Sequence, residues 1–260
     1  MSDAITIPTH CAYLPEHSSL IEMKFDLSES GMRRYRRLVS LLVKRRRCIF
    51  CGWFGYRFEP FGNEMTYRAD ALCPICGSLE RHRLAVLLLR DRIARGQKTL
   101  HVAPEPTMVS WLVSFSSEYL NVDLKNPAMQ KMDLTNLELP DRCKTLVWCS
   151  HVLDDIPDDR KALSEMFRVL APGGILVLQV TIGGDTTYED PSAVTRAERL
   201  KKFLWEDHVR LYGRDLQRRV EEQGFKCQIL SATDLSSSDQ TLYAIDSLLY
   251  REVFFCQRPL

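Results

Sequence analysis

The sequence lacks a long hydrophobic run and a leader-like opening. Its longest unbroken apolar stretch, Leu84 to Leu89, is far shorter than the roughly 20 residues that a membrane span needs. No basic, apolar, small-residue signal pattern opens the chain. Apolar residues make up 45% and charged residues 27% of its 260 residues, a balance that excludes a disordered or fibrous chain. We therefore expect a soluble cytoplasmic protein with no membrane partner.

Acidic residues are missing from one segment. Between Ser30 and Phe58 there are nine basic residues and no acidic one. Residues 1–98 hold 17 Lys and Arg against 10 Asp and Glu, a charge of +7, whereas residues 99–260 hold 18 against 24, a charge of −6. Apolar residues recur here at helical spacing, which predicts a helix that runs to about Arg47. Its basic side chains either form a solvated face or bind an anionic partner such as a nucleic acid.

The nine cysteines do not suggest a disulfide framework, because their number is odd and the chain is not small and secreted. Four of them form two matched Cys-x2-Cys-Gly turns, Cys48/Cys51 and Cys73/Cys76. Two such turns supply the four thiolates of a closed site, which is typical of structural zinc. Iron is the alternative, since thiolates suit both metals. The glycine after each turn permits a positive φ, which lets backbone N–H groups face the sulfurs. Three residues close by could offset the negative charge: Arg81, His82 and Arg83.

Strand and helix patterns alternate from residue 99 onward. The expected strands are 99–102, 119–122, 145–149, 175–180, 225–230 and 250–255, and the expected helices lie near 79–95, 108–115, 160–170 and 214–222. Such alternation predicts βαβ units and a parallel sheet with helices on both faces, which is a Rossmann-like α/β fold. We expect three parts: a flexible arm (1–29), a basic helix with the four-cysteine module (30–83), and the α/β domain (84–260) with a polar insert near 181–213.

Two segments of this sheet carry a family resemblance. Residues 145–159 read TLVWCSHVLDDIPDD, and residues 167–178 read FRVLAPGGILVL. They resemble the class I S-adenosylmethionine-dependent methyltransferases over residues 99–255. A narrower likeness, over 30–255, is carried by CPICGSLERHR (73–83), HVAPEP (101–106), YEDP (188–191) and EDHVRLYG (206–213). It is similar to a subfamily with an N-terminal zinc ribbon, which we associate with the tailoring of small molecules. The resemblance implies S-adenosylmethionine as cofactor.

The resemblance also implies where the cofactor binds. The loop after the first strand reads Ala103-Pro104-Glu105-Pro106 and lacks the glycines that the family uses there. Asp123 ends the second strand, where a carboxylate can accept the ribose hydroxyls or cap a turn. Asp133 stands at the family's adenine position, although it could also cap a helix. The expected cofactor-binding residues are His101, Ala103, Pro104, Glu105, Asp123, Asp133, Leu134, Ser150 and His151.

Two histidines are candidates for a base that deprotonates the acceptor. His151 follows the fourth strand, and His208 lies in the polar insert. Histidine suits this work near neutral pH, although either could be a structural histidine with one hydrogen bond. On an extended segment His208, Arg210 and Tyr212 would share one face. With Tyr188 they would cradle a carboxylate or phosphate of the acceptor.

Three functions are compatible with these patterns. The first is a methyltransferase for a small, polar or anionic acceptor, with the zinc module as a lid or wall of its pocket. The second is an RNA methyltransferase that docks RNA on the basic module, where four aromatic residues could stack on bases: Trp53, Phe54, Tyr56 and Phe58. The third is a binding protein without activity, which the missing loop glycines suggest.

Overall fold

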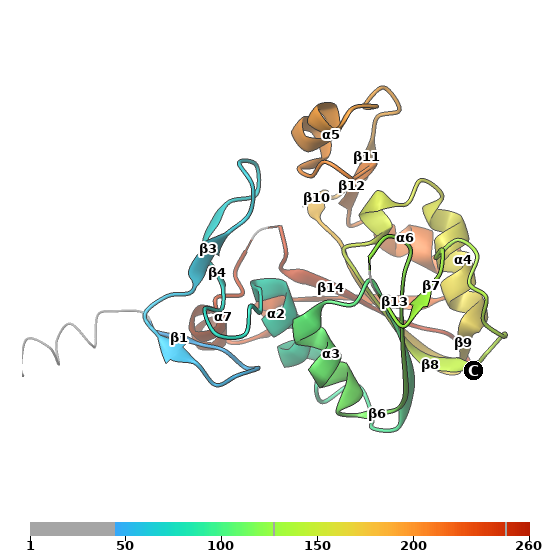
Figure 1. Ribbon diagram of the computed structural model, residues 1–260, viewed down its shortest axis with the longest axis horizontal. Coiled ribbons are helices and arrows are strands. Elements are labelled where there is room, and N and C mark those ends of the chain that lie inside the picture. The colour runs from blue at the N-terminus through green and yellow to red at the C-terminus, as the bar shows by residue number, and fades with distance from the viewer. Residues whose placement is uncertain (1–44, 127, 248) are drawn as a thin grey trace, which may run out of the picture. The chain divides into compact units, whose positions relative to one another are not determined.

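The computed structural model describes residues 45–260 apart from 127 and 248 (Figure 1). The expected flexible arm and most of the expected basic helix therefore lie outside the described residues. Lys44–Leu260 form one compact unit. The boundary that we expected near residue 83 falls inside α2 (Glu80–Leu89), which belongs to both the cysteine module and the α/β domain.

A seven-stranded sheet lies at the centre of this unit. From one edge to the other its strands are β13 (Lys226–Ser231), β14 (Glu252–Gln257), β9 (Leu170–Gln179), β8 (Lys144–Ser150), β5 (Gln97–Val102), β6 (Ser116–Asp123) and β7 (Gln130–Lys131). The five strands from β9 to β7 are parallel, whereas β14 runs antiparallel between β9 and β13. The predicted α/β fold with a Rossmann-like methyltransferase sheet is confirmed.

Helices cover both faces of the sheet, because its inner strands are apolar on both sides. Along β8, Val147 and Cys149 pack on one face with α4 (Asp159–Val169) and α6 (Leu216–Glu221). Leu146 and Trp148 alternate with them and pack on the other face with α2 and α3 (Pro106–Val113). The α4 helix begins at Asp158, whose carboxylate accepts a 3.0 Å hydrogen bond from the Lys161 N–H, as predicted.

The polar insert folds as a small sheet with one helix. Its strand β12 (Arg210–Gly213) lies between β10 (Ile182–Gly184) and β11 (Tyr188–Glu189). The helix α5 (Arg196–Phe203) begins with a capping box of Thr195 and Glu198. Short pieces complete the domain: the 3-10 turns η1 (Leu153–Asp155) and η2 (Ala232–Asp234), and the helix α7 (Ser237–Tyr243). No helix among the described residues has both the length and the hydropathy that crossing a bilayer requires.

The cysteine module consists of two short hairpins. The first pairs β1 (Arg46–Arg47) with β2 (Phe54–Gly55), and the second pairs β3 (Glu59–Phe61) with β4 (Arg68–Leu72). The expected basic helix therefore does not extend to Arg47. Its last residues are extended because they pair with the strand that follows the first Cys-x2-Cys turn.

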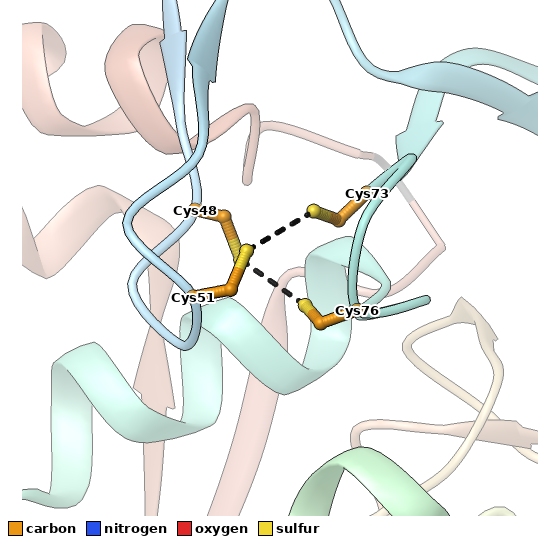
Figure 2. A group of neighbouring side chains, drawn as sticks. All are labelled: Cys48, Cys51, Cys73 and Cys76. Carbon is orange, nitrogen blue, oxygen red and sulfur yellow. Dashed lines mark hydrogen bonds between the residues drawn. The ribbon is translucent and has the colours of Figure 1, made fainter.

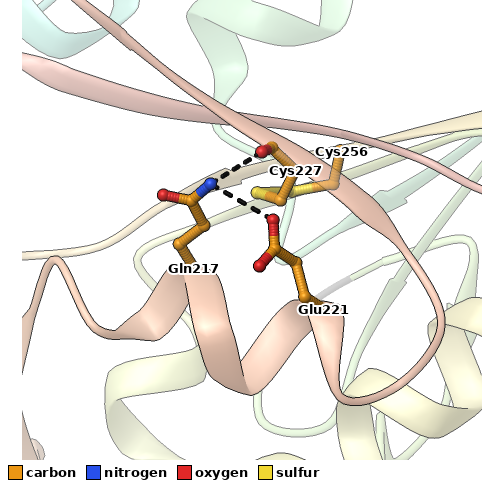
Figure 3. The surroundings of a disulfide bond; sticks show 4 residues. All are labelled: Gln217, Glu221, Cys227 and Cys256. Carbon is orange, nitrogen blue, oxygen red and sulfur yellow. Dashed lines mark hydrogen bonds between the residues drawn. A yellow bond between two sulfur atoms is a disulfide. The ribbon is translucent and has the colours of Figure 1, made fainter.

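One disulfide corrects the expectation drawn from the cysteine count. Cys227 of β13 and Cys256 of β14 stand opposite each other in the antiparallel register and are bonded (Figure 3). Gln217 of α6 donates a 2.8 Å hydrogen bond to the Cys227 carbonyl. The sequence did not reveal this pair, because the two residues are neighbours only through the order of the strands.

Candidate functional site

The four cysteines of the module converge on one point (Figure 2). Their Sγ atoms all lie within 4.8 Å of one another, with 3.5 Å between Cys48 and Cys76 and 3.7 Å between Cys51 and Cys73. Zinc–sulfur bonds of about 2.3 Å in a tetrahedron place the sulfurs roughly 3.8 Å apart. The donor set and its spacing therefore fit a zinc ion.

The two Cys-x2-Cys turns have the same backbone geometry. The Cys48 sulfur accepts hydrogen bonds from the N–H groups of Phe50 and Cys51, and the Cys73 sulfur accepts them from the equivalent positions of its own turn. The glycines that follow, Gly52 and Gly77, have φ angles of 74° and 70°. The predicted positive φ is confirmed, and the N–H groups favour sulfurs in the anionic form.

Of the three basic residues at positions 81–83, Arg83 packs within the cysteine module. Its fully buried guanidinium donates to the carbonyls of Ser78 and Ala71 at 2.7 and 3.0 Å, and to that of Tyr243 in α7 at 2.7 Å. The guanidinium also stacks over the Phe58 ring at 3.8 Å. Burial lowers the pKa of Arg83 to about 10, so it keeps its charge at neutral pH.

Arg81 and His82 do not accompany Arg83, which corrects the expectation for both. They bind Glu105 instead, each with a shortest contact of 2.7 Å to its Oε1 atom. Burial alone would raise the pKa of Glu105, but the hydrogen bond from His82 and the charge of Arg81 hold it well below its usual range. Glu105 is the residue before α3, so the module is tied to the loop after β5.

Two adjoining cavities, of about 580 and 210 Å³, lie in the domain, and the larger of these two is at the carboxyl ends of β5, β6 and β8. This is where the strand order reverses and where ligands bind in open parallel sheets. Five of the predicted cofactor residues line it: Ala103, Asp123, Asp133, Leu134 and His151.

Asp123 is held in place by the turn that follows β6. Its Oδ1 atom accepts hydrogen bonds from the N–H groups of Lys125 and Asn126 at 2.7 and 2.8 Å. Burial alone would raise the pKa of Asp123, but these hydrogen bonds outweigh burial and lower it. The carboxylate therefore both caps the turn and presents a charged acceptor at the wall of the cavity.

Ala103 takes the conformation that a glycine would normally supply. Its φ is 48°, in the left-handed region, and its N–H donates a 2.8 Å hydrogen bond to the Val122 carbonyl of β6. An alanine pays about 1–2 kcal/mol for this conformation. The loop thus turns sharply beside the cavity although it contains no glycine.

Asp133 and Leu134 also line the larger cavity. The Asp133 Oδ1 atom accepts 2.8 and 2.9 Å hydrogen bonds from the N–H and the hydroxyl of Thr135. Leu134 is buried and offers an apolar surface. A polar edge beside an apolar surface is the environment that an adenine ring needs.

Four predicted cofactor residues do not line this cavity. His101 is buried, its Nδ1 atom is 2.8 Å from the Tyr119 hydroxyl, and burial lowers its pKa to about 4. Glu105 is taken by Arg81 and His82, and Ser150 is buried in β8. Pro104 lines a separate, open hollow on the surface. None of these four residues lines the larger cavity.

A smaller cavity, of about 210 Å³, adjoins the larger one. Its walls come from the β3–β4 hairpin, from α2, from the ends of β8 and β9, and from the insert. The residues that line it include Phe61, Arg68, Arg81, Trp205, His208 and Tyr250. The Asn63 amide of the hairpin donates a 3.0 Å hydrogen bond to the Leu204 carbonyl of the insert. The module and the insert therefore meet beside this cavity.

His151 and Asp155 line both cavities. His151 has a φ of 51°, an unusual conformation for a side chain of this size. Burial, followed by the positive charge of Arg81, holds the pKa of His151 well below its ordinary value, so its ring is neutral. Its buried Nε2 atom has no hydrogen-bond partner among the described residues. Burial raises the pKa of Asp155 to about 6.

His208 faces the smaller cavity in a defined tautomer. Its Nδ1 atom is 3.0 Å from the Phe203 carbonyl, which can only accept, so Nδ1 carries the proton. The Nε2 atom of the neutral ring is then a proton acceptor. Burial lowers the pKa of His208, which keeps this neutral form populated at neutral pH.

The expected anion cradle of the insert is not formed, which corrects the roles given to Tyr188, Arg210 and Tyr212. Arg210 and Tyr212 do share one face, but that face lies against η1 and α4. The Tyr212 hydroxyl donates a 2.8 Å hydrogen bond to buried Asp159, and Arg210 donates to the carbonyls of Ile156 and Pro157 at 2.6 and 2.7 Å. A buried carboxylate requires such partners. Tyr188 packs on Phe203, and its hydroxyl donates to Asp190.

Sequence reasoning missed Arg68 and Tyr250 as site residues. The sequence places Arg68 only within the cysteine module, and Tyr250 only at the start of a strand. The hairpin and the last strand are separated by about 180 residues in sequence, and their proximity depends on the tertiary fold. The one sequence-based expectation that pointed toward this site was that the cysteine module forms a wall of the acceptor pocket.

Comparisons with known proteins agree with this fold. Residues 86–178, about a third of the chain, match the model of a family described as a methyltransferase domain. No curated protein matches the sequence significantly. One similar solved structure is a chain from Haloferax volcanii, in a complex of the Trm112 methyltransferase activator with a protein described as a methyltransferase. It has a TM-score of 0.50 at 12% identity, and the match covers 70% of this chain and 92% of that chain.

Two further solved structures have TM-scores of 0.49. YcgJ from Bacillus subtilis is 14% identical, and the match covers 69% of this chain and 99% of the YcgJ chain. A phosphoethanolamine N-methyltransferase from Haemonchus contortus is 16% identical, and the match covers 68% of this chain and 52% of that chain. The family match, together with the sheet, supports a class I S-adenosylmethionine-dependent methyltransferase.

Proposed function

We propose that the protein transfers a methyl group from S-adenosylmethionine to a small polar or anionic acceptor. The observation that carries this proposal is that two cavities of different size meet at His151 and Asp155. The larger one has the volume of a cofactor site, whereas the smaller one lies below the roughly 300–1,000 Å³ that are usual for drug-sized ligands. Only a small acceptor, or one small group of a larger molecule, can enter it.

Residues of the larger cavity would hold the cofactor by different chemistries. Asp123 would accept the ribose hydroxyls, Asp133 and Leu134 would contact the adenine, and the turn at Ala103 would bring the backbone close to the methionine end. The cofactor supplies an electrophilic methyl group on a sulfonium. His151 and Asp155 stand at the junction through which that methyl group must reach the acceptor.

Residues of the smaller cavity would position and deprotonate the acceptor. The acceptor atom forms a bond to the methyl carbon as the sulfur–carbon bond breaks, and the sulfur keeps the electron pair. The Nε2 atom of His208 takes the proton that an oxygen or nitrogen acceptor loses. Much of the rate enhancement then comes from holding the two reactants in line.

We also propose that a zinc ion occupies the four-cysteine site in a structural role. All four ligand positions come from cysteine, which leaves no position for a substrate. The ion would cross-link the two hairpins, and the second hairpin contributes Phe61 and Arg68 to the smaller cavity. Zinc thereby supports the acceptor site without taking part in the reaction.

The experiment that tests this function uses methyl-labelled S-adenosylmethionine with a cell extract, separated afterwards into small-molecule and RNA fractions. We expect label in a small metabolite, which mass spectrometry then identifies. Label in RNA that is lost after ribonuclease would replace the small acceptor by RNA docked on the basic module. Binding of the cofactor without any transfer, in extracts from several sources, would favour a binding protein.

A further inference from the structure

Two arginines of the smaller cavity are each anchored by a carboxylate outside it. Arg68 forms an ion pair with Glu80, which is almost fully buried. The Nε and Nη2 atoms of Arg81 donate to Glu105 Oε1 at 3.2 and 2.7 Å. Neither carboxylate lines the smaller cavity, so the ion pairs orient the guanidinium groups from behind.

Each guanidinium retains donors for a ligand. The Arg68 Nη1 atom donates to the Thr66 carbonyl. Within the described part of the chain, no hydrogen bond is made by Arg68 Nη2 or by Arg81 Nη1, and both side chains line the smaller cavity. Guanidinium groups bind carboxylates through planar, charge-assisted hydrogen bonds. Two oriented guanidiniums in one small cavity therefore favour a carboxylate ligand.

Aromatic rings flank the first of these arginines. The Arg68 guanidinium carbon lies 4.4 Å from the centre of the Tyr250 ring and 5.5 Å from that of Phe61. Trp205 of the insert lines the same cavity and is 41% exposed. Flat apolar surfaces beside a cation suit a planar ligand, because its faces can stack while its acidic edge meets the guanidinium.

The Tyr250 ring contacts His151 as well as Arg68. The His151 ring packs edge to face against the same Tyr250 ring, with 5.3 Å between the ring centres. Arg68 and His151 thus both contact the Tyr250 ring. Asp155 lies at the His151 end, where its charge disfavours a second carboxylate. The acid group of a ligand is therefore directed to the arginines and away from Asp155, which lies where the two cavities meet.

We propose that the acceptor is a small planar acid, an aromatic or conjugated carboxylate whose acid group binds Arg68 and Arg81. Its methyl-accepting atom, at the opposite edge of the ring, then lies between His151 and His208. The inference rests on the proposed function only where it assigns methylation to the atom at the opposite edge of the ring. Binding of the carboxylate is measured without the cofactor.

The test is a calorimetric titration of the full-length protein with a matched panel. The acids are benzoate, 4-hydroxybenzoate and 3,4-dihydroxybenzoate, and the controls are the three corresponding amides, which have the same shape and no charge. We expect at least one acid to bind, and its amide to bind at least tenfold more weakly. Equal binding of acid and amide, or no binding by any acid of the panel, overturns the proposal.

Variants identify the cavity as the binding site. Arg68→Gln should weaken binding of the acid at least tenfold and leave binding of the amide unchanged. Arg68→Lys, which keeps the charge without the planar fork, should fall between wild type and Arg68→Gln and serves where Arg68→Gln is unfolded. Arg57→Gln removes an exposed arginine of the same module and should bind as wild type does. Wild-type affinity in both Arg68 variants overturns the proposal.

A parallel titration with S-adenosylhomocysteine separates this inference from the proposed function. If S-adenosylhomocysteine does not bind while the acid does, the methyltransferase proposal fails and the carboxylate site remains. If S-adenosylhomocysteine binds and the acid does not distinguish itself from its amide, the carboxylate inference fails alone.

Discussion

The Nε2 atom of His82 lies 2.7 Å from Glu105 Oε1, and this contact connects the cysteine module to the loop after β5. The Nδ1 atom of the same ring accepts a 3.1 Å hydrogen bond from the Leu79 N–H, so Nε2 carries the proton and donates to Glu105. Glu105 precedes α3 and follows the left-handed turn at Ala103. The four-cysteine module and the loop beside the larger cavity are therefore mechanically linked.

Loss of the metal site should weaken cofactor binding at a distance. We expect about one zinc per chain in wild type, and less in Cys73→Ser, because three ligands hold the ion poorly. The freed module no longer orients α2, so the affinity for S-adenosylhomocysteine falls as well. Elemental analysis and calorimetry measure the two effects. Cys143→Ser, at a free cysteine outside the module, should change neither. A metal-free but fully binding wild type would contradict this link.

Asp123→Asn should lower the affinity for S-adenosylhomocysteine by about 10- to 100-fold. The asparagine can still cap the turn, but it loses charge-assisted hydrogen bonds that are worth about 1.5–3 kcal/mol. Calorimetry measures the affinity, and circular dichroism confirms the fold. Glu118→Gln removes an exposed carboxylate from the same strand and should bind as wild type does. Equal affinities in all three proteins would remove Asp123 from the cofactor site.

Ala103 should tolerate glycine and reject a branched side chain. Glycine removes the strain of the left-handed conformation but adds flexibility to the unfolded chain, so Ala103→Gly should stay within about 1 kcal/mol of wild type. Ala103→Val should lower the free energy of unfolding by at least about 1 kcal/mol and weaken cofactor binding, because a β-branched residue resists this φ. Urea unfolding measures both variants. A stable, binding Ala103→Val protein would show that the loop conformation is not required.

The rate of methyl transfer should fall on acidification through the lowered pKa of His208. The neutral ring accepts the proton, and burial keeps that pKa below 6.5, so activity persists at pH 6.5 and is lost at lower pH. Asp155, with a pKa of about 6, titrates nearby, so the profile is also measured for Asp155→Asn, which should keep the acidic limb. His208→Gln should reduce kcat by about 10²- to 10⁴-fold and abolish that limb. A His208→Gln enzyme with the wild-type rate would exclude it as the base.

Asp154 should make the protein less stable as the pH rises toward 7. It is fully buried, its Oδ1 atom accepts a 3.1 Å hydrogen bond from the Thr181 N–H, and burial raises its pKa from 3.8 to about 7. The folded state thus keeps a proton that the unfolded state releases above 3.8. The contribution of this proton to the free energy of unfolding is full below pH 3.8 and is lost by about pH 7. Between these values the free energy of unfolding falls by about 1.4 kcal/mol per pH unit. Urea unfolding of wild type and Asp154→Asn from pH 4 to 8 measures the difference, and parallel stability curves would contradict it.

The strands were predictable from the sequence because their signal is local. Runs such as 145–149 and 175–180 are apolar on both sides of the backbone, and a strand between two layers of helices requires that pattern. The metal site was equally readable, since both pairs of ligands are close in sequence. The spacing of the two pairs was enough to predict that Cys48, Cys51, Cys73 and Cys76 form one site.

The direction of individual side chains was not predictable in the same way. Arg210 and Tyr212 alternate correctly along β12, but the choice of which face meets the cavity is made by Asp159 of α4, which needs partners for its buried charge. The absence of glycine suggested a degenerate cofactor loop, whereas Ala103 adopts the left-handed turn itself. Such compensations depend on long-range contacts, such as the hydrogen bond from Ala103 to Val122.

The most direct test of this account is a crystal structure of the protein with S-adenosylhomocysteine. The account predicts the ligand in the larger cavity, with its ribose on Asp123, its adenine beside Asp133 and Leu134, and its sulfur at the junction next to His151. A ligand bound elsewhere, or one whose sulfur points away from the smaller cavity, would contradict the proposal that methyl transfer occurs between the two cavities.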